Sequence, residues 1–228
     1  MTQLDPQTRV ADLVTQRPSL ARLMEGLGID YCCQGRQSLA IACAEKALDL
    51  DGVMAQIEQI LEQPPEKNLE SLSLTELADH IVACHHGFLR ECLPLLSRQV
   101  DRVAMVHGPS HPELREVQRV FHEFSSEMLH HMQKEEQILF PAIRALDREQ
   151  TTQIPLEHII GKMEAEHEDS GAALSRLNSL THGYVVPETA CTTYRSMLQG
   201  LAELELDTHA HVHAENHILF ARALKLSG

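Results

Sequence analysis

The feature that most constrains the fold of this chain is a ten-residue pattern that occurs twice in its second half. Residues 131–140 and 211–220 both read H-x-x-x-E-x-x-I-L-F. A spacing of four places the imidazole and the carboxylate on one helix face, one turn apart. Two such helices facing each other would bring two imidazoles and two carboxylates to a shared point. We therefore expect a metal site, for two metal ions, in the interior of a helical protein.

Length and composition agree with an all-helical protein. The chain has 228 residues, enough for one large bundle and a small additional domain, with no Trp and only 4% aromatic residues. Its formal net charge of −14 argues against nucleic acid and against an anionic membrane surface as partners. No stretch approaches the ~20 apolar residues of a membrane span, and the N-terminus lacks a signal-peptide pattern. We expect a cytoplasmic protein.

The six cysteines show no spacing typical of a disulfide framework, so we expect free thiols in a reducing compartment. Two of them, Cys32 and Cys33, are adjacent in a turn that contains Gly35. Adjacent residues do not easily chelate one metal ion, and a disulfide between them would be strained. The pair is either two small apolar side chains in a turn, or an exposed thiol pair that carries out redox chemistry or hands on a metal ion.

Residues 1–62 are predicted to form a small helical domain. Pro18 separates two short apolar helices, Gly28 can end the second, and Ser38 can cap a third. Residues 63–72 are polar and contain two prolines, which is typical of a linker.

Residues 73–228 carry the pattern of an antiparallel four-helix bundle. Ser73 and Glu76 match a capping box at the start of the first helix. Apolar residues recur at spacings of three and four in four segments, of which the third follows Pro155 and the fourth begins near Pro187. The core stripes of these segments include His131, Glu135, His167, His211 and Glu215. Ligands on facing helices of a bundle form an interior metal site.

Other histidines are harder to assign from the pattern. His85 and His86 are adjacent on the first helix, and the apolar stripe does not decide between them. The fourth helix carries a separate line of histidines at a spacing of four, namely His209, His213 and His217. For this line, a solvated polar face is favoured over a surface zinc or nickel site.

The ligand types favour iron, manganese or copper. Zinc sites have about four ligands, often with Cys, and calcium and magnesium prefer oxygen. A His-rich set with only two carboxylates suits the transition metals. Ferritin-like di-iron bundles use Glu and His at a spacing of three. This chain has His first and Glu four residues later, which is the order of the hemerythrin-type di-iron site.

Along nearly its whole length the chain resembles the RIC family, the repair-of-iron-centres proteins, which are hemerythrin-like di-iron proteins with a small N-terminal domain. The matching segments are 30–35, 79–94, His107, 131–141, 163–167, 190–193 and 211–220. The resemblance implies iron ligands at His86, His107, His131, His167 and His211, with Glu135 and Glu215 as bridging carboxylates. It also implies two non-haem iron ions with an oxo bridge.

The family is associated with restoring iron–sulfur clusters damaged by nitric oxide or peroxide, by supplying iron, so the implied partners are damaged iron–sulfur proteins. A metal-binding repair protein is favoured over a turnover enzyme. The alternatives are a nitric oxide reductase or a sensor of nitric oxide or oxygen. Five imidazoles, two bridging carboxylates and an oxo bridge would fill about eleven of the twelve positions of two octahedral ions, leaving one for a diatomic ligand. Glu166, beside His167, either supports the ligands or is an exposed carboxylate.

Overall fold

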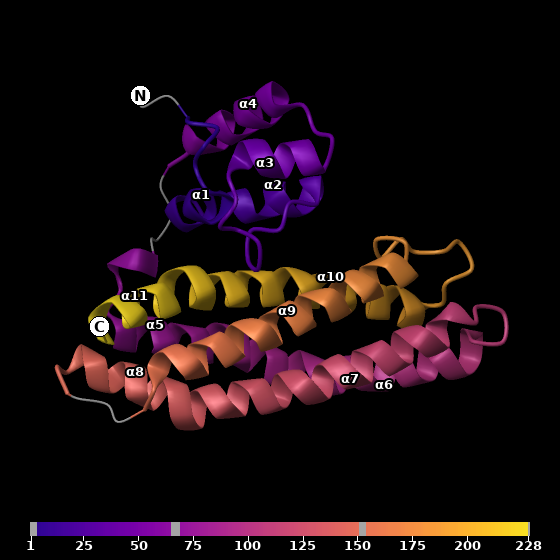
Figure 1. Ribbon diagram of the computed structural model, residues 1–228. Helices are drawn as coiled ribbons and strands as arrows, with labels where there is room; N and C mark the ends of the chain where they lie inside the picture. The colour runs from indigo at the N-terminus through magenta and orange to yellow at the C-terminus, as the bar shows by residue number, and fades with distance from the viewer. Residues whose placement is uncertain (1–3, 65–68, 151–153, 228) are drawn as a thin grey trace.

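The structure is a computed structural model that describes residues 4–64, 69–150 and 154–227. Within these ranges the chain is helical, with one isolated bridge between Arg9 and Ser38 and no strand, so the predicted all-α class is confirmed. A small helical domain lies on one side of a long four-helix bundle (Figure 1). Among the described residues, no helix is long and apolar enough to cross a membrane.

The small domain consists of short helices whose ends follow the expected signals. Gly28 adopts a left-handed conformation, φ 67°, at the end of α2, where a residue without Cβ is favoured. Ser38 accepts a hydrogen bond from the backbone of Ile41 and caps α3. The helices are α1 (Val10–Gln16), α2 (Leu20–Leu27), α3 (Leu39–Glu45) and α4 (Leu50–Leu61).

The bundle is built from four long helical segments. The first begins at the capping box that Ser73 and Glu76 form, as predicted, and the third begins at Leu156, directly after Pro155. The fourth begins at Thr192 rather than near Pro187. A short 3-10 helix, η1 (Leu69–Ser71), precedes them; residues 65–68 of the expected linker lie outside the described ranges. The segments are α5 (Leu74–Ile81), η2 (Val82–His86) and α6 (Gly87–His107); α7 (Glu113–Lys134), η3 (Glu135–Leu139) and α8 (Phe140–Asp147); α9 (Leu156–Leu180); and α10 (Thr192–His213), η4 (Ala214–Leu219) and α11 (Phe220–Ser227).

Three of the four segments contain a π-helical turn, namely η2, η3 and η4. A π turn places one extra residue in the helix and changes the direction in which the following side chains point, and such turns are frequent at functional sites. His86 ends η2, Glu135 begins η3 and Glu215 lies in η4. The apolar core is divided at this level into two clusters, one containing Phe140 and Phe220 and the other Phe121.

The small domain rests on the fourth segment through the loop between α2 and α3 (Figure 1). His213 is buried, and its Nδ1 donates to the carbonyl of Tyr31 at 3.2 Å while its Nε2 lies 3.0 Å from the hydroxyl of Thr15. Burial, together with the neighbouring His217, lowers the pKa of His213 to about 4, so the ring is neutral. His217 donates to the carbonyl of Cys32 at 2.8 Å.

The expectation of a solvated face for this line of histidines is therefore wrong. His209, the third member, contacts Glu25 of the small domain at 2.6 Å. The three side chains form the docking face of the small domain, because their polar atoms satisfy polar atoms of its helices and loop.

Replacing His209, His213 and His217 together by Ala is expected to detach the small domain without loss of bound metal. The substitutions leave polar groups of the loop without partners, at a cost of about 1–3 kcal/mol for each buried group. Small-angle scattering should show a larger radius of gyration, and limited proteolysis should release the bundle. A variant with Ala at the half-buried His122 and the exposed His130, both on α7, is the control. Metal loss in the triple variant would show that this face reaches the interior site.

Candidate metal centre

Six ionisable side chains meet in the interior of the bundle, at the level of the π turns. Each is at most 3% exposed, so water reaches none of them freely. They are His86, His131, His167, His211, Glu135 and Glu215.

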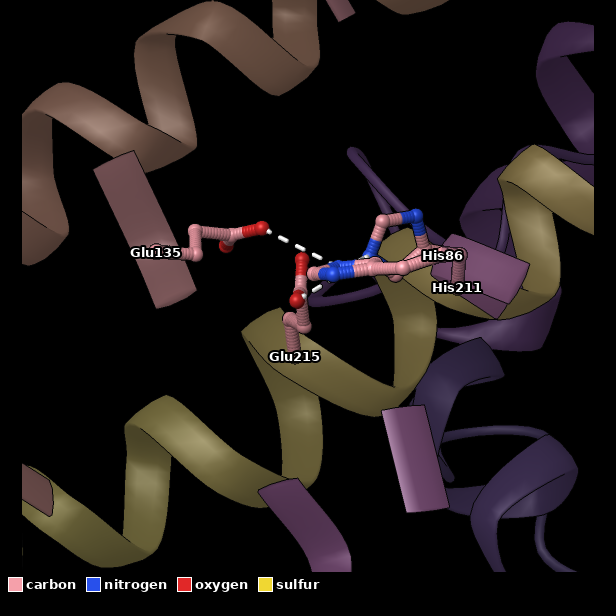
Figure 2. Close-up of side chains that lie close together, drawn as sticks. All are labelled: His86, Glu135, His211 and Glu215. Carbon is pink, nitrogen blue, oxygen red and sulfur yellow. Dashed lines mark hydrogen bonds and ion pairs between the residues drawn. The ribbon is translucent and has the colours of Figure 1, made fainter. Parts of the chain in front are cut away.

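The first half of this cluster is shown in Figure 2. His86 Nε2 lies 3.4 Å from Glu135 Oε2, and His211 Nε2 lies 3.0 Å from Glu215 Oε1. The two Nε2 atoms are 3.2 Å apart. Two nitrogens and two oxygens from three helical segments therefore surround one point, as donors to a single metal ion would.

The second half repeats the first with the remaining atoms. His131 Nε2 lies 3.3 Å from Glu135 Oε1, and His167 Nε2 lies 3.1 Å from Glu215 Oε2. These two Nε2 atoms are 3.0 Å apart. Each carboxylate thus offers one oxygen to each position, which is the arrangement of two bridging carboxylates between two metal ions.

The electrostatics of the cluster fit a pair of cations. Within the described part of the chain, none of the four carboxylate oxygens has a hydrogen-bond partner. Burial would raise the pKa of Glu215, but the imidazoles of His211 and His167 hold it well below its ordinary value. Burial would lower the pKa of His131, but the carboxylate of Glu135 raises it to about 9. Two buried carboxylates thus require nearby positive charge, and metal ions bound by the six side chains would supply it.

The outer nitrogens of three of the four rings are held by hydrogen bonds. A ring that donates from Nδ1 presents the lone pair of Nε2 to the ion, so these partners fix both tautomer and orientation. The donations are His86 to Glu136 at 2.6 Å, His131 to Glu166 at 2.8 Å and His167 to Asn216 at 2.8 Å. In the described residues, Nδ1 of His211 has no such partner, and this ring stacks on His85.

The structure places His86, and not His85, in the cluster. His86 is fully buried, whereas Nδ1 of His85 lies 2.9 Å from Asp207 on α10. Of the two alternatives for Glu166, the structure supports the contact with a ligand. It accepts from His131 and forms an ion pair with Lys134.

Glu166→Gln is expected to weaken metal binding about 10–100-fold, the usual effect of removing an outer hydrogen-bonding partner of a ligating His. The amide still accepts a hydrogen bond but carries no charge to polarise the imidazole of His131. Competition with a chelator would measure the change in affinity, and Glu164→Gln, two residues away, is the control. Equal affinities for wild type and Glu166→Gln would contradict this role.

His107 does not lie in the cluster, which corrects the expectation drawn from the family resemblance. It ends α6, 21 residues after His86, and a rise of 1.5 Å per residue separates the two by about 30 Å. Its Nε2 lies 3.3 Å from Sγ of Cys191, and its ring packs on Tyr194.

The metal content of His107→Ala is therefore expected to equal that of wild type. Elemental analysis of the two proteins, purified side by side, measures this directly. His131→Ala serves as the matched variant in which the metal content falls. A drop in His107→Ala as large as in His131→Ala would mean that the end of α6 approaches the metal centre in solution.

Two further site residues were not predicted, although the repeat contains a signal for them. Glu136 and Asn216 follow Glu135 and Glu215 directly, so they occupy the same position in the two copies. Glu136 orients His86 and Asn216 orients His167, each on another segment. A polar residue after the carboxylate in both copies marks this role.

Cys32 and Cys33 lie closer to the bundle than expected. Cys32 is buried, Cys33 is half-buried, and Sγ of Cys33 lies 3.6 Å from the backbone carbonyl of His167. Of the two alternatives for this pair, the structure does not support an exposed one, because the loop that carries it packs on α9 and on the fourth segment.

Comparison with known proteins gives matches over both parts of the chain. Residues 6–61 match ScdA_N, a domain of unknown function, and residues 76–223 match the hemerythrin HHE cation binding domain. The iron-sulfur cluster repair protein ScdA of Staphylococcus epidermidis is 37% identical over 219 residues, 93% of this chain and 96% of ScdA. The iron-sulfur cluster repair protein YtfE of Escherichia coli is 39% identical over 218 residues, 94% of this chain and 96% of YtfE. YtfE of an Enterobacter species is 36% identical over 215 residues, with the same coverage.

Proposed function

The chain belongs to the family of iron–sulfur cluster repair proteins that includes ScdA and YtfE, and we propose that it repairs damaged clusters by donating iron from a di-iron centre. The clusters are those damaged by nitric oxide or peroxide, and the partners are the proteins that contain them. The six buried side chains hold the two ions, and bound iron is the material that is delivered.

The observation that carries this proposal is the charge of the donor set. Each position has two imidazoles, which bind a metal ion in their neutral form, and one oxygen from each of two carboxylates. Two ferrous ions bring four positive charges, against two negative charges from Glu135 and Glu215. A site with more carboxylates would retain Fe²⁺ more strongly, so this donor set suits release.

The residues of the chain contribute in three ways. The outer partners Glu136, Glu166 and Asn216 orient the rings, and the apolar clusters on either side exclude water from the centre. Four protein donors would leave positions free at an octahedral ion, so bound iron would supply a site for an exchangeable ligand such as nitric oxide or oxygen.

We place this function in the cytoplasm. All six cysteines are free thiols in the structure, which suits a reducing compartment.

The test is transfer of labelled iron. The full chain is loaded with ⁵⁷Fe and mixed anaerobically with a hydro-lyase whose iron–sulfur cluster has been damaged by nitric oxide and then freed of it. Recovery of hydro-lyase activity, with ⁵⁷Fe in the restored cluster, is the expected result. Free Fe²⁺ at equal concentration, with dithiothreitol, is the control.

Two results would count against donation. Activity restored without ⁵⁷Fe in the cluster would show that the chain repairs clusters without supplying iron. Nitrous oxide formed from nitric oxide by the reduced protein over many turnovers, without transfer of iron, would favour the alternative of a nitric oxide reductase.

A further inference from the structure

The turn that carries the two adjacent cysteines is organised around one carboxylate. Oδ1 of Asp30 accepts the backbone N–H groups of Cys32 and Cys33, both at 2.9 Å. This fixes the backbone so that the two thiols lie on the same side of the turn, with Sγ atoms 3.8 Å apart. Sγ of Cys32 also lies 3.3 Å from Oδ1 of Asp30.

These distances match those required for chelation. Two thiolates bound at ~2.3 Å to one tetrahedral ion lie about 3.8 Å from each other. The turn therefore presents the two sulfurs at the separation that a bound ion requires, so the expected difficulty for adjacent cysteines does not apply here. With Asp30, three donor atoms lie within 4.8 Å of one another.

The thiol pair opens onto a cavity between the small domain and helices α9 and α10. The cavity has a volume of about 890 Å³ and is lined by both cysteines, by Lys46 and by four further carboxylates: Glu25, Glu45, Glu168 and Glu205. Tyr31, a residue that is only 1% exposed, belongs to the same lining. Counting Asp30, five carboxylates and one lysine line the cavity, and the excess of negative charge favours a cation in this space.

The thiol pair is also next to the metal centre. Sγ of Cys33 lies 3.6 Å from the backbone carbonyl of His167, whose ring faces the second position of the centre. The carbonyl of Cys32 accepts from Asn216, which orients the same ring. One residue of α9 therefore separates the centre from the cavity.

We propose that Asp30, Cys32 and Cys33 form a third metal site, for a single divalent ion that binds thiolates. On binding, both thiols lose their protons to water and two metal–sulfur bonds form, with no change in oxidation state. The site rests on the geometry alone. That its natural ion is Fe²⁺ on the way from the centre to a recipient rests on the function proposed above.

Cobalt(II) is a suitable probe, because a thiolate–cobalt bond gives a charge-transfer absorption that carboxylate and imidazole ligands do not. The full chain, loaded with two irons and reduced, is titrated anaerobically with Co²⁺. We expect one further ion per chain with a thiolate absorption, and its displacement by Fe²⁺. A chain that takes up no third ion, or takes it up without the thiolate absorption, would overturn the site.

Matched variants locate the ion. Cys32→Ser/Cys33→Ser is expected to lose the absorption and to bind at least ~100-fold more weakly, with the di-iron spectrum unchanged. Asp30→Asn keeps an oxygen for the two backbone N–H groups but loses the charge, so the absorption is retained and affinity falls about 10-fold. Cys191→Ser, which removes an exposed thiol directly before α10 and beside His107 at the end of α6, is expected to behave as wild type.

The two single variants, Cys32→Ser and Cys33→Ser, keep the test decisive if the double variant does not fold. Each is expected to weaken binding and reduce the absorption, and an unchanged titration in both would overturn the site. The cobalt readout is independent of repair activity. A third ion with no recovery of a damaged enzyme would reject iron donation and retain the site; donation without a third ion would do the reverse.

Discussion

Glu135→Gln is expected to reduce bound iron from two ions per chain to less than one. The two oxygens of Glu135 face different metal positions, so one substitution removes a charged donor from both. A neutral amide is a weak bridging ligand. The loss of metal affinity should therefore exceed the ~10–100-fold loss that follows from removing a hydrogen-bonding partner of a ligating His. Iron per chain, measured by elemental analysis, and magnetic coupling between the remaining ions are the two measurements.

His211→Ala is the matched comparison for this prediction. His211 contributes to the first position only, and the four donors of the second position remain. This variant should therefore retain about one iron per chain. Two coupled irons in Glu135→Gln, or equal losses in the two variants, would contradict the assignment of Glu135 as a bridge.

Removal of the metal is expected to lower the melting temperature of the protein by roughly 15 °C or more. Ligand at about 1,000 times its dissociation constant stabilises the folded state by about 4 kcal/mol per site, and there are two sites. For a protein of this size each kcal/mol corresponds to about 2–4 °C. Without metal, Glu135 and Glu215 remain fully buried and depend on the neighbouring imidazoles for compensation. Calorimetry of the iron-loaded and metal-free proteins measures the difference.

A double variant separates the destabilisation caused by buried charge from the stability of the rest of the fold. Glu135→Gln/Glu215→Gln is expected to bind no iron, yet to melt at or above the temperature of the metal-free wild type, because its amides need no compensating charge. If the metal-free wild type melts at the same temperature as the loaded protein, the six side chains do not bind the ions tightly.

The bundle and most of the cluster could be predicted because they depend on local rules. The capping box at Ser73 and the end of α2 at Gly28 follow from nearest-neighbour chemistry. The repeated His and Glu at a spacing of four follow from helix geometry, which also explains why their side chains converge in the interior.

Two features depend on tertiary structure and lie beyond these rules, whereas a third, His107, does not. The π turns at Glu135 and Glu215 depend on backbone hydrogen bonds that side-chain periodicity does not encode. The spacing of the histidines predicts that His213 lies on a separate face of the fourth helix, but it does not predict that the small domain covers this face. His107 was misassigned because it was carried over from a family motif, although its distance along α6 from His86 already argues against a shared centre.

X-ray absorption at the iron edge of the loaded wild-type protein tests the central claim most directly. If each carboxylate bridges the two positions, the spectrum will contain a strong iron–iron scattering contribution, with oxygen and nitrogen as nearest neighbours and two irons per chain. A spectrum without an iron–iron contribution, or with sulfur as the main ligand, would contradict a di-iron centre built from four imidazoles and two bridging carboxylates.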